Sequence, residues 1–244
     1  MWLVSVDLLC SVIVIITLQQ WAVKKNLLAK PGIFLTGNLV FLLGMLPWFD
    51  DLARYSISLH SLQSVMVHHF APLLWIGALR HKESSITRAH NTLSHWPTTL
   101  LMSIFAVLTW VWMLPSFHPL LMQSAIIYSG MKWLMALSGL ALCLSMLSHH
   151  QKSSYWQKLN NVTVVMPLLL WGLLMFIFPT MYADTHTSHH QHHMMMSHLP
   201  AWLQLSSIQD QFIGGLLFIL SGFFYWKSNS ISVAFTRHAR RFSK

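Results

Sequence analysis

Long apolar stretches, separated by short polar segments, run through the whole sequence. A transmembrane helix needs about 20 mainly apolar residues, whereas a membrane β-strand would show short alternating segments. The continuous runs therefore predict an all-α fold, an integral membrane bundle of seven transmembrane helices. We place these helices at residues 2–22, 32–49, 55–79, 96–114, 120–147, 162–178 and 208–226.

The composition indicates that lipid, and not water, is the main solvent of the chain. Hydrophobic residues make up 55% of the 244 residues and charged residues only 9%, against about 25% charged in a soluble domain. So few charges cannot cover a water-exposed surface of this size. The sequence also shows no nucleophile–base pair, phosphate-binding loop or paired carboxylates at catalytic spacing, so we do not predict an enzyme.

The lysines and arginines predict the orientation, because they stay on the cytoplasmic side during insertion. With the N-terminus outside and the C-terminus in the cytoplasm, the cytoplasmic segments hold every Lys and Arg except Arg54 and Lys132. Residues 1–228 form the predicted membrane domain, which includes an outer loop at 183–203. Residues 229–244 form a basic cytoplasmic tail, which we expect to contact anionic membrane lipids and not nucleic acid.

The outer loop contains a segment of metal-binding side chains. Neutral imidazole binds copper, zinc and nickel, and thioether favours Cu(I) over zinc, so both together point to copper. No fixed spacing is evident, which predicts a collector of ions more than a geometric site. A polar loop without a specific ligand is the alternative. The residues concerned are His186, His189, His190, His192, His193, Met194, Met195, Met196 and His198.

Several polar residues lie inside the predicted spans or at their outer ends. His60 and His68 share one face of the third span, about 12 Å apart along its axis, too far to bind one ion jointly. His118 lies at the level of His60, and Asp7 and Asp210 lie near the outer ends of the first and last spans. We hypothesise that these groups converge into a metal site that opens outward. Alternatively, each histidine bonds to a neighbouring helix.

Lys132 lies near the middle of the fifth span, where an unpaired charge costs several kcal/mol. We expect it to pair with Asp7, Asp210 or a backbone carbonyl, or to be neutral. A cation here counts against a cation channel through the bundle. We interpret the adjacent Asp50 and Asp51 as a solvated helix end.

Several motifs resemble the polytopic CtaG family of bacterial cytochrome c oxidase assembly factors, over residues 31–226. They are His60-Ser-Leu-Gln63 with the following Ala71-Pro72-Leu-Leu-Trp-Ile-Gly77, then Ser138-Gly139, Pro179-Thr-Met-Tyr182 and Asp210-Gln211-Phe-Ile-Gly214. The resemblance implies seven spans in the bacterial cytoplasmic (inner) membrane and a role in helping copper reach the oxidase.

At some positions where the family has a potential metal ligand, this sequence has a different residue. The histidine that follows Gln63 in the family is Ser64 here, and the family's histidine pair in the fifth span corresponds to Tyr128 and Lys132. The residues that match the family's motifs are His60, Gln63, Asp210 and Gln211.

These observations predict a copper-handling assembly factor for a respiratory cytochrome c oxidase, with copper as Cu(I) for its ligand. Its expected partners are oxidase subunits and membrane lipids, and a copper donor protein is compatible with the same role. One alternative is a non-catalytic accessory subunit of a terminal oxidase that has lost the family's metal ligands. A metal-ion transporter is the third hypothesis, and haem ligation by the histidines stays open.

Overall fold

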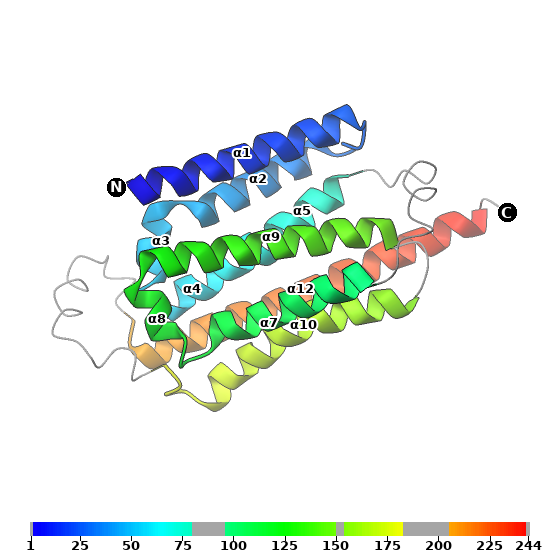
Figure 1. Ribbon diagram of the computed structural model, residues 1–244. Helices are drawn as coiled ribbons and strands as arrows, with labels where there is room; N and C mark the ends of the chain where they lie inside the picture. Colours follow the sequence, from blue (N-terminus) through cyan, green and yellow to red (C-terminus); the bar gives the residue numbers. More distant parts are fainter. Residues whose placement is uncertain (1, 80–95, 150–153, 183–204, 243–244) are drawn as a thin grey trace.

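The computed structural model describes residues 2–79, 96–149, 154–182 and 205–242, and every regular element among them is a helix (Figure 1). This confirms the predicted all-α fold, and each of the seven predicted apolar stretches contains helix. The elements are α1 (Trp2–Lys24), α2 (Pro31–Met45), α3 (Pro47–Ala53), α4 (Ile57–Ser64), the π-helix η1 (Val65–Phe70), α5 (Ala71–Ala78), α7 (Trp96–Met113), α8 (His118–Gln123), α9 (Ala125–His149), α10 (Ser154–Ile177) and α12 (Ser207–Phe242).

Three of the described helical segments are long and apolar enough to cross a membrane. They are Val6–Lys24, Ala125–Leu144 and Ser207–Lys227, and a fourth is added if α2 and α3, which meet at 59°, count as one span. Thr99–Met113 and Val162–Ile177 are apolar but shorter. These helices indicate a membrane protein, while the count of seven spans and the orientation stay predictions.

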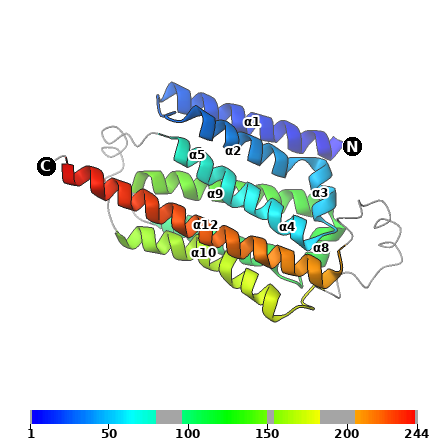
Figure 2. The ribbon, with the colours of Figure 1, turned by 180° about the vertical axis from the view of Figure 1, so that it is seen from behind.

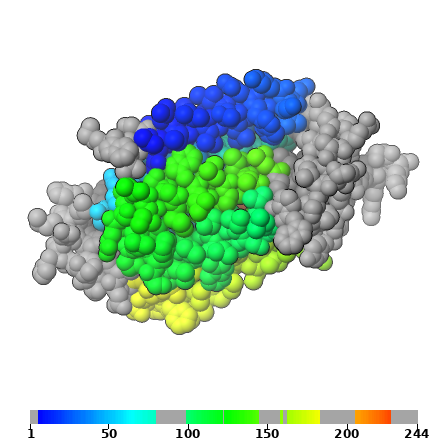
Figure 3. All heavy atoms as spheres, in the orientation of Figure 1, coloured from blue at the N-terminus to red at the C-terminus, as the bar shows by residue number. Residues whose placement is uncertain are grey.

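The bundle is elongated, with the helices roughly along one direction. Figures 1 and 2 show α1 and α2 along one side, α10 on the opposite side, and the α4–η1–α5 rod and α9 between them. The space-filling view shows α1 along the upper edge of the bundle, above α9 (Figure 3). The start of α1 lies at the same end as α3 and α8, and α12 ends at the opposite end. α12 continues to Phe242, past the predicted boundary at residue 228.

The third stretch is a rod of three segments because of a proline. Pro72 has no N–H, and in an α-helix its ring would clash with the carbonyl of His68, four residues earlier. Just before Pro72 the helix changes from α to π, and the Ala71 N–H donates to the carbonyl of Met66, five residues earlier. A π-turn within a helix is often found at a functional site, and this one holds His68 and His69.

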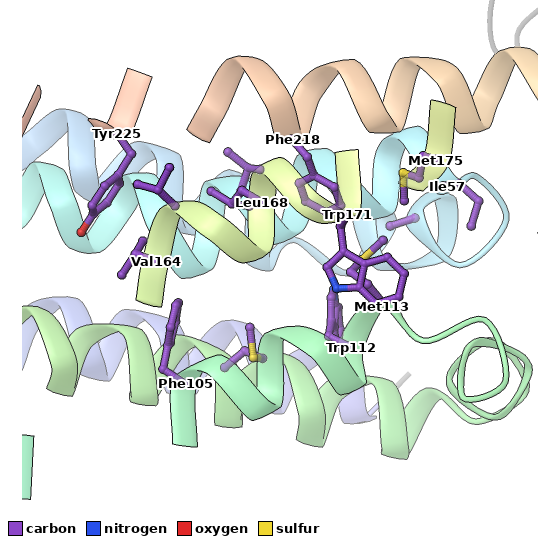
Figure 4. Close-up of a cluster of buried hydrophobic side chains, with 14 of the residues drawn as sticks. Ile57, Phe105, Trp112, Met113, Val164, Leu168, Trp171, Met175, Phe218 and Tyr225 are labelled. Carbon is purple, nitrogen blue, oxygen red and sulfur yellow. The ribbon is translucent and has the colours of Figure 1, made fainter. Parts of the chain in front are cut away.

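Glycines set the closest approaches between helices. A Cβ atom on Gly139 of α9 would lie 2.6 Å from the main-chain oxygen of His68, so α9 packs directly on the backbone of η1. Gly172 of α10 and Gly215 of α12 face each other, and a Cβ on Gly172 would lie 2.7 Å from the oxygen of Gly215. The main apolar core fills the space among α7, α10 and α12 (Figure 4), with side chains that include Phe105, Trp112, Val164, Leu168, Trp171 and Phe218.

Candidate functional site

Lys132 of α9 is completely buried and pairs with two carboxylates. Its Nζ atom lies 3.2 Å from Oδ2 of Asp7 on α1 and 2.5 Å from Oδ2 of Asp50 on α3. The predicted partner Asp7 is thus confirmed, and the structure shows no ion pair between Lys132 and Asp210 among the described residues. Three separate helices are tied together by one ammonium group.

The interpretation of the Asp50–Asp51 pair as a solvated helix end is wrong for Asp50. The Asp50 side chain is 15% exposed and binds Lys132, whereas that of Asp51 is 68% exposed and pairs with Arg54 at 2.9 Å. Both residues lie in α3, and neighbouring side chains on a helix point about 100° apart, so Asp50 faces Lys132 while Asp51 faces outward. The run of apolar residues alone did not predict the bend between α2 and α3, although Pro47 at the start of α3 marks its position.

Asp7 fastens α1 to one face of α9. Besides Lys132, its carboxylate accepts hydrogen bonds from the hydroxyl of Ser129, at 2.7 and 2.9 Å, and from the indole N–H of Trp133, at 3.0 Å. The three donors are spaced i, i+3 and i+4 along α9, so they share one face. A buried carboxylate is tolerated here because each of its oxygens is hydrogen-bonded.

A hydrogen-bond chain leads from the ion pair to His60. The amide Nε2 of Gln63 donates to Oδ1 of Asp50 at 2.5 Å and to the carbonyl of Gly44 at 2.7 Å. The amide oxygen of Gln63 accepts from the hydroxyl of Tyr128. The same hydroxyl lies 3.2 Å from Nδ1 of His60, and all of these polar side chains are buried or partly buried. We call Lys132, Asp50, Gln63 and Tyr128 the polar relay.

His60 and His118 lie next to each other at the α8 end of the bundle. Their rings meet edge to face with centroids 5.3 Å apart, which confirms that His118 lies at the level of His60. The His60 ring also stacks on the indole of Trp112, with centroids 4.6 Å apart. Nε2 of His60 is buried and has no hydrogen-bond partner among the described residues. Trp112, which the sequence analysis did not single out, is therefore part of the site.

The two histidines of η1 have different surroundings. Nδ1 of His68 lies 3.2 Å from the hydroxyl of Ser64. The His68 ring is roughly perpendicular to the ring of Trp112, with centroids 5.5 Å apart. His69 instead packs against Phe105, with ring centroids 5.4 Å apart. Neither ring nitrogen of His69 has a hydrogen-bond partner within the described part of the chain. Only His68 is thus linked, through Trp112, to the surroundings of His60.

Asp210 caps α4. One carboxylate oxygen accepts from the hydroxyl of Ser56 at 2.7 Å and from both the N–H, at 3.1 Å, and the hydroxyl of Ser58. The other accepts from the N–H of Ile57 at 2.6 Å. Carboxylates at a helix N-terminus satisfy N–H groups that have no partner within the helix. These bonds give Asp210 a structural role, and its role as a metal ligand stays a prediction.

Gln211 holds the end of α10 in a similar way. Its amide N–H₂ donates to the carbonyls of Met175 and Phe178, both at 2.7 Å, and its oxygen accepts from the N–H of Tyr182 at 3.2 Å. The Tyr182 hydroxyl donates to the carbonyl of Met113, and burial raises the pKa of Tyr182. The ring of Tyr182 reaches back to that of His118, with centroids 5.2 Å apart.

Of the five side chains that we expected to converge into a metal site, two lie side by side in the described part of the structure. Within the residues that the structure describes, no three His, Cys, Asp or Glu side chains lie close enough to hold a metal ion together. Asp7 is engaged by Lys132 and Asp210 by α4, which leaves His60 and His118 beside each other. The His/Met segment, His186–His198, lies outside the described residues.

The fold and the site define a helical membrane protein with a buried ion-pair network that leads to a histidine pair. Residues 13–226 match the model of the cytochrome c oxidase caa3 assembly factor family, Caa3_CtaG. The chain therefore belongs to this family of oxidase assembly factors, as its motifs predicted. No curated protein and no solved structure matches the chain significantly.

Proposed function

We propose that this protein is a copper-handling assembly factor, which binds Cu(I) at the outer face of the membrane and aids its delivery to a respiratory cytochrome c oxidase. The family supports the assembly role. One observation carries the copper proposal: the rings of His60 and His118 adjoin, and Nε2 of His60 has no hydrogen-bond partner among the described residues. Copper is here a cargo and not a resident cofactor, so the proposed role is not catalytic.

The proposed topology is seven spans in the bacterial cytoplasmic membrane, with the N-terminus outside. Two observations support it. α1 begins and α12 ends at opposite ends of the bundle, as an odd number of crossings requires (Figures 1 and 2). Lysine and arginine also gather in the segments that this topology places in the cytoplasm. The histidine pair, which is buried, then lies near the outer end of the bundle, on the side where copper is received.

Two imidazoles suit a transferable copper ion. Imidazole is a good ligand for copper, and Cu(I) accepts two nitrogen donors in a nearly linear arrangement. Two ligands hold the ion less firmly than three or four would, which favours its release to a partner. The Trp112 indole covers one face of the His60 ring, so the ring is held in a fixed plane before copper binds.

The described chain that precedes the His/Met segment ends next to this pair. The last described residue before it is Tyr182, whose ring lies 5.2 Å from that of His118. We infer that the segment collects copper and passes it to His60 and His118.

Copper content decides the proposal. The full-length protein, purified in mild detergent after growth with copper, is assayed by mass spectrometry beside a His60→Ala/His118→Ala variant. We expect bound copper in the wild type and a loss of the ion held by the pair in the variant. His69→Leu is the matched control, since the ring nitrogens of His69 make no hydrogen bonds among the described residues. Equal copper content in all three samples would overturn the role of the pair.

An accessory oxidase subunit is the second candidate, and one observation favours it. Tyr128 and Lys132, which stand where the family resemblance places histidines, are engaged in the polar relay. If no sample contains copper while an oxidase co-purifies in fixed stoichiometry, this second function replaces the first.

A further inference from the structure

The orientation of the Gln63 amide is determined by its neighbours. Its Nε2 faces the carbonyl of Gly44 and a carboxylate oxygen of Asp50, and both of these groups only accept hydrogen bonds. The flipped amide would set its oxygen against two other oxygens. Asp50 is in turn held as an acceptor by the ammonium of Lys132, 2.5 Å away.

The orientation of Gln63 then determines the direction of the Tyr128 hydroxyl. The Gln63 oxygen accepts only, so the hydroxyl hydrogen of Tyr128 must point to it. A phenol has a single hydrogen to donate. Toward Nδ1 of His60, 3.2 Å away, the Tyr128 oxygen can therefore present only a lone pair.

The lone pair of Tyr128 selects one tautomer of His60. A neutral imidazole carries hydrogen on one nitrogen and a lone pair on the other. Nδ1 must donate to Tyr128, which leaves the lone pair on Nε2. That nitrogen is buried and without a hydrogen-bond partner among the described residues. The main chain of Trp112 also interacts with the His60 ring as a hydrogen-bond acceptor.

We propose that Lys132, Asp50, Gln63 and Tyr128 act as a positioning relay, which holds His60 as the Nδ1–H tautomer and keeps the Nε2 lone pair ready to bind a metal ion. The tautomer follows from the hydrogen bonds alone, and only its use for Cu(I) rests on the proposed function. Partners of this kind behind a ligating histidine fix its tautomer and its ring orientation. Lys132 thereby affects the tautomer of His60, although the two side chains do not contact each other in the relay.

Nitrogen NMR of the copper-free protein tests the relay. In a sample with ¹⁵N-labelled histidine, the His60→Gln variant identifies the His60 signals. We expect the wild type to show a protonated Nδ1 and an unprotonated Nε2. Tyr128→Phe removes the acceptor, so the Nδ1–H form should lose its preference. A wild-type spectrum with hydrogen on Nε2, or an unchanged tautomer in Tyr128→Phe, would overturn the proposal.

Ser64→Ala is the matched control. Ser64 lies on the same helix and contacts Nδ1 of His68, so its loss should change the signals of His68 and leave the His60 tautomer intact. Tryptophan fluorescence melting of each variant reports whether the bundle is folded. If Tyr128→Phe does not accumulate, the wild-type spectrum alone still decides which nitrogen of His60 carries the hydrogen.

Copper titration of the same samples separates this inference from the proposed function. Loss of the relay should weaken copper binding by about 10- to 100-fold, as for other partners of metal-ligating histidines. The expected tautomer with no copper binding would leave the relay standing and remove the copper function. Tight copper binding with the opposite tautomer would remove the relay and retain the function.

Discussion

The Nζ atom of Lys132 lies 2.5 Å from a carboxylate oxygen of Asp50. The same ammonium contacts Asp7 at 3.2 Å, so a single buried cation joins α9 to α1 and α3. In a membrane bundle no hydrophobic effect drives helices together, and polar contacts between them carry more of the specificity. This ion pair therefore does two things: it fixes the position of α1 and anchors the relay that ends at His60.

Lys132→Met should destabilise the bundle strongly. The substitution leaves the carboxylates of Asp7 and Asp50 buried without their cation, and breaking a buried ion pair costs about 3–5 kcal/mol. Thermal unfolding in detergent, followed by tryptophan fluorescence, measures the effect. The control is Asp51→Asn, because Asp51 is exposed and its pair with Arg54 should contribute only about 0–1 kcal/mol. Equal melting temperatures for the two variants would contradict the structural importance of the buried pair.

Removing all three charges should be less damaging than removing one. The variant Asp7→Asn/Asp50→Asn/Lys132→Met has no unpaired buried charge, and replacement of a whole buried ion pair is often nearly neutral. We expect its melting temperature to lie above that of Lys132→Met. A melting temperature at or below that of the single variant would indicate that the hydrogen bonds of the carboxylates, and not charge pairing, dominate.

Gly139→Ala should destabilise the contact between α9 and η1. The added methyl group would lie 2.6 Å from the main-chain oxygen of His68, so the helices must separate. Overpacking of this kind costs about 1–3 kcal/mol. Gly130→Ala is a matched control on the same helix, since a Cβ there meets nothing within 4 Å. It should be neutral or stabilising by about 0.5–1 kcal/mol, because alanine favours helix over glycine. Similar melting temperatures for both variants would be inconsistent with this close approach.

Asp210→Ala should loosen the start of α4 and its attachment to α12. It removes hydrogen bonds to the N–H groups of Ile57 and Ser58, and bonds to a charged group contribute about 1.5–3 kcal/mol each. Gln209→Ala is the neighbouring control, because the side chain of Gln209 bonds only to the exposed N–H of Ser206 in the described contacts. Hydrogen exchange of the α4 amides should rise in the first variant alone. Unchanged exchange there would remove the capping role.

The sequence predicted those features that depend on local patterns or on large single energies. Each predicted apolar run contains helix in the described residues, and the cost of an unpaired Lys132 led to Asp7 as one of its possible partners, but not to Asp50, the nearer one. The bend at Leu46, by contrast, decides that Asp50 turns inward, and a bend depends on how two helices pack. Likewise, His68 and His69 are adjacent in η1 but point to different neighbours, and which neighbours these are depends on the packing of the bundle.

The relay itself could not be predicted for a related reason. Its members, such as Gln63 of α4 and Tyr128 of α9, are 65 residues apart in the chain and meet only in the folded bundle. In the sequence, Trp112 is one of many apolar residues in its span, and nothing in its local sequence indicates that it stacks on His60. Family motifs located His60, Gln63 and Asp210, but only the structure separates the histidine at the site from the aspartate that caps α4.

The order of residues in the His/Met segment should matter less than its composition. No fixed spacing is evident among its histidines and methionines, so a collector should tolerate a scrambled sequence of residues 186–198. Replacement of the histidines by glutamine and the methionines by leucine should instead slow copper loading at limiting copper and reduce copper capacity to that of the His60–His118 pair. Stopped-flow loading with a Cu(I) chelator as donor measures both. A scrambled segment that loads as slowly as the replaced one would show that defined spacing, and not composition, delivers copper to the pair.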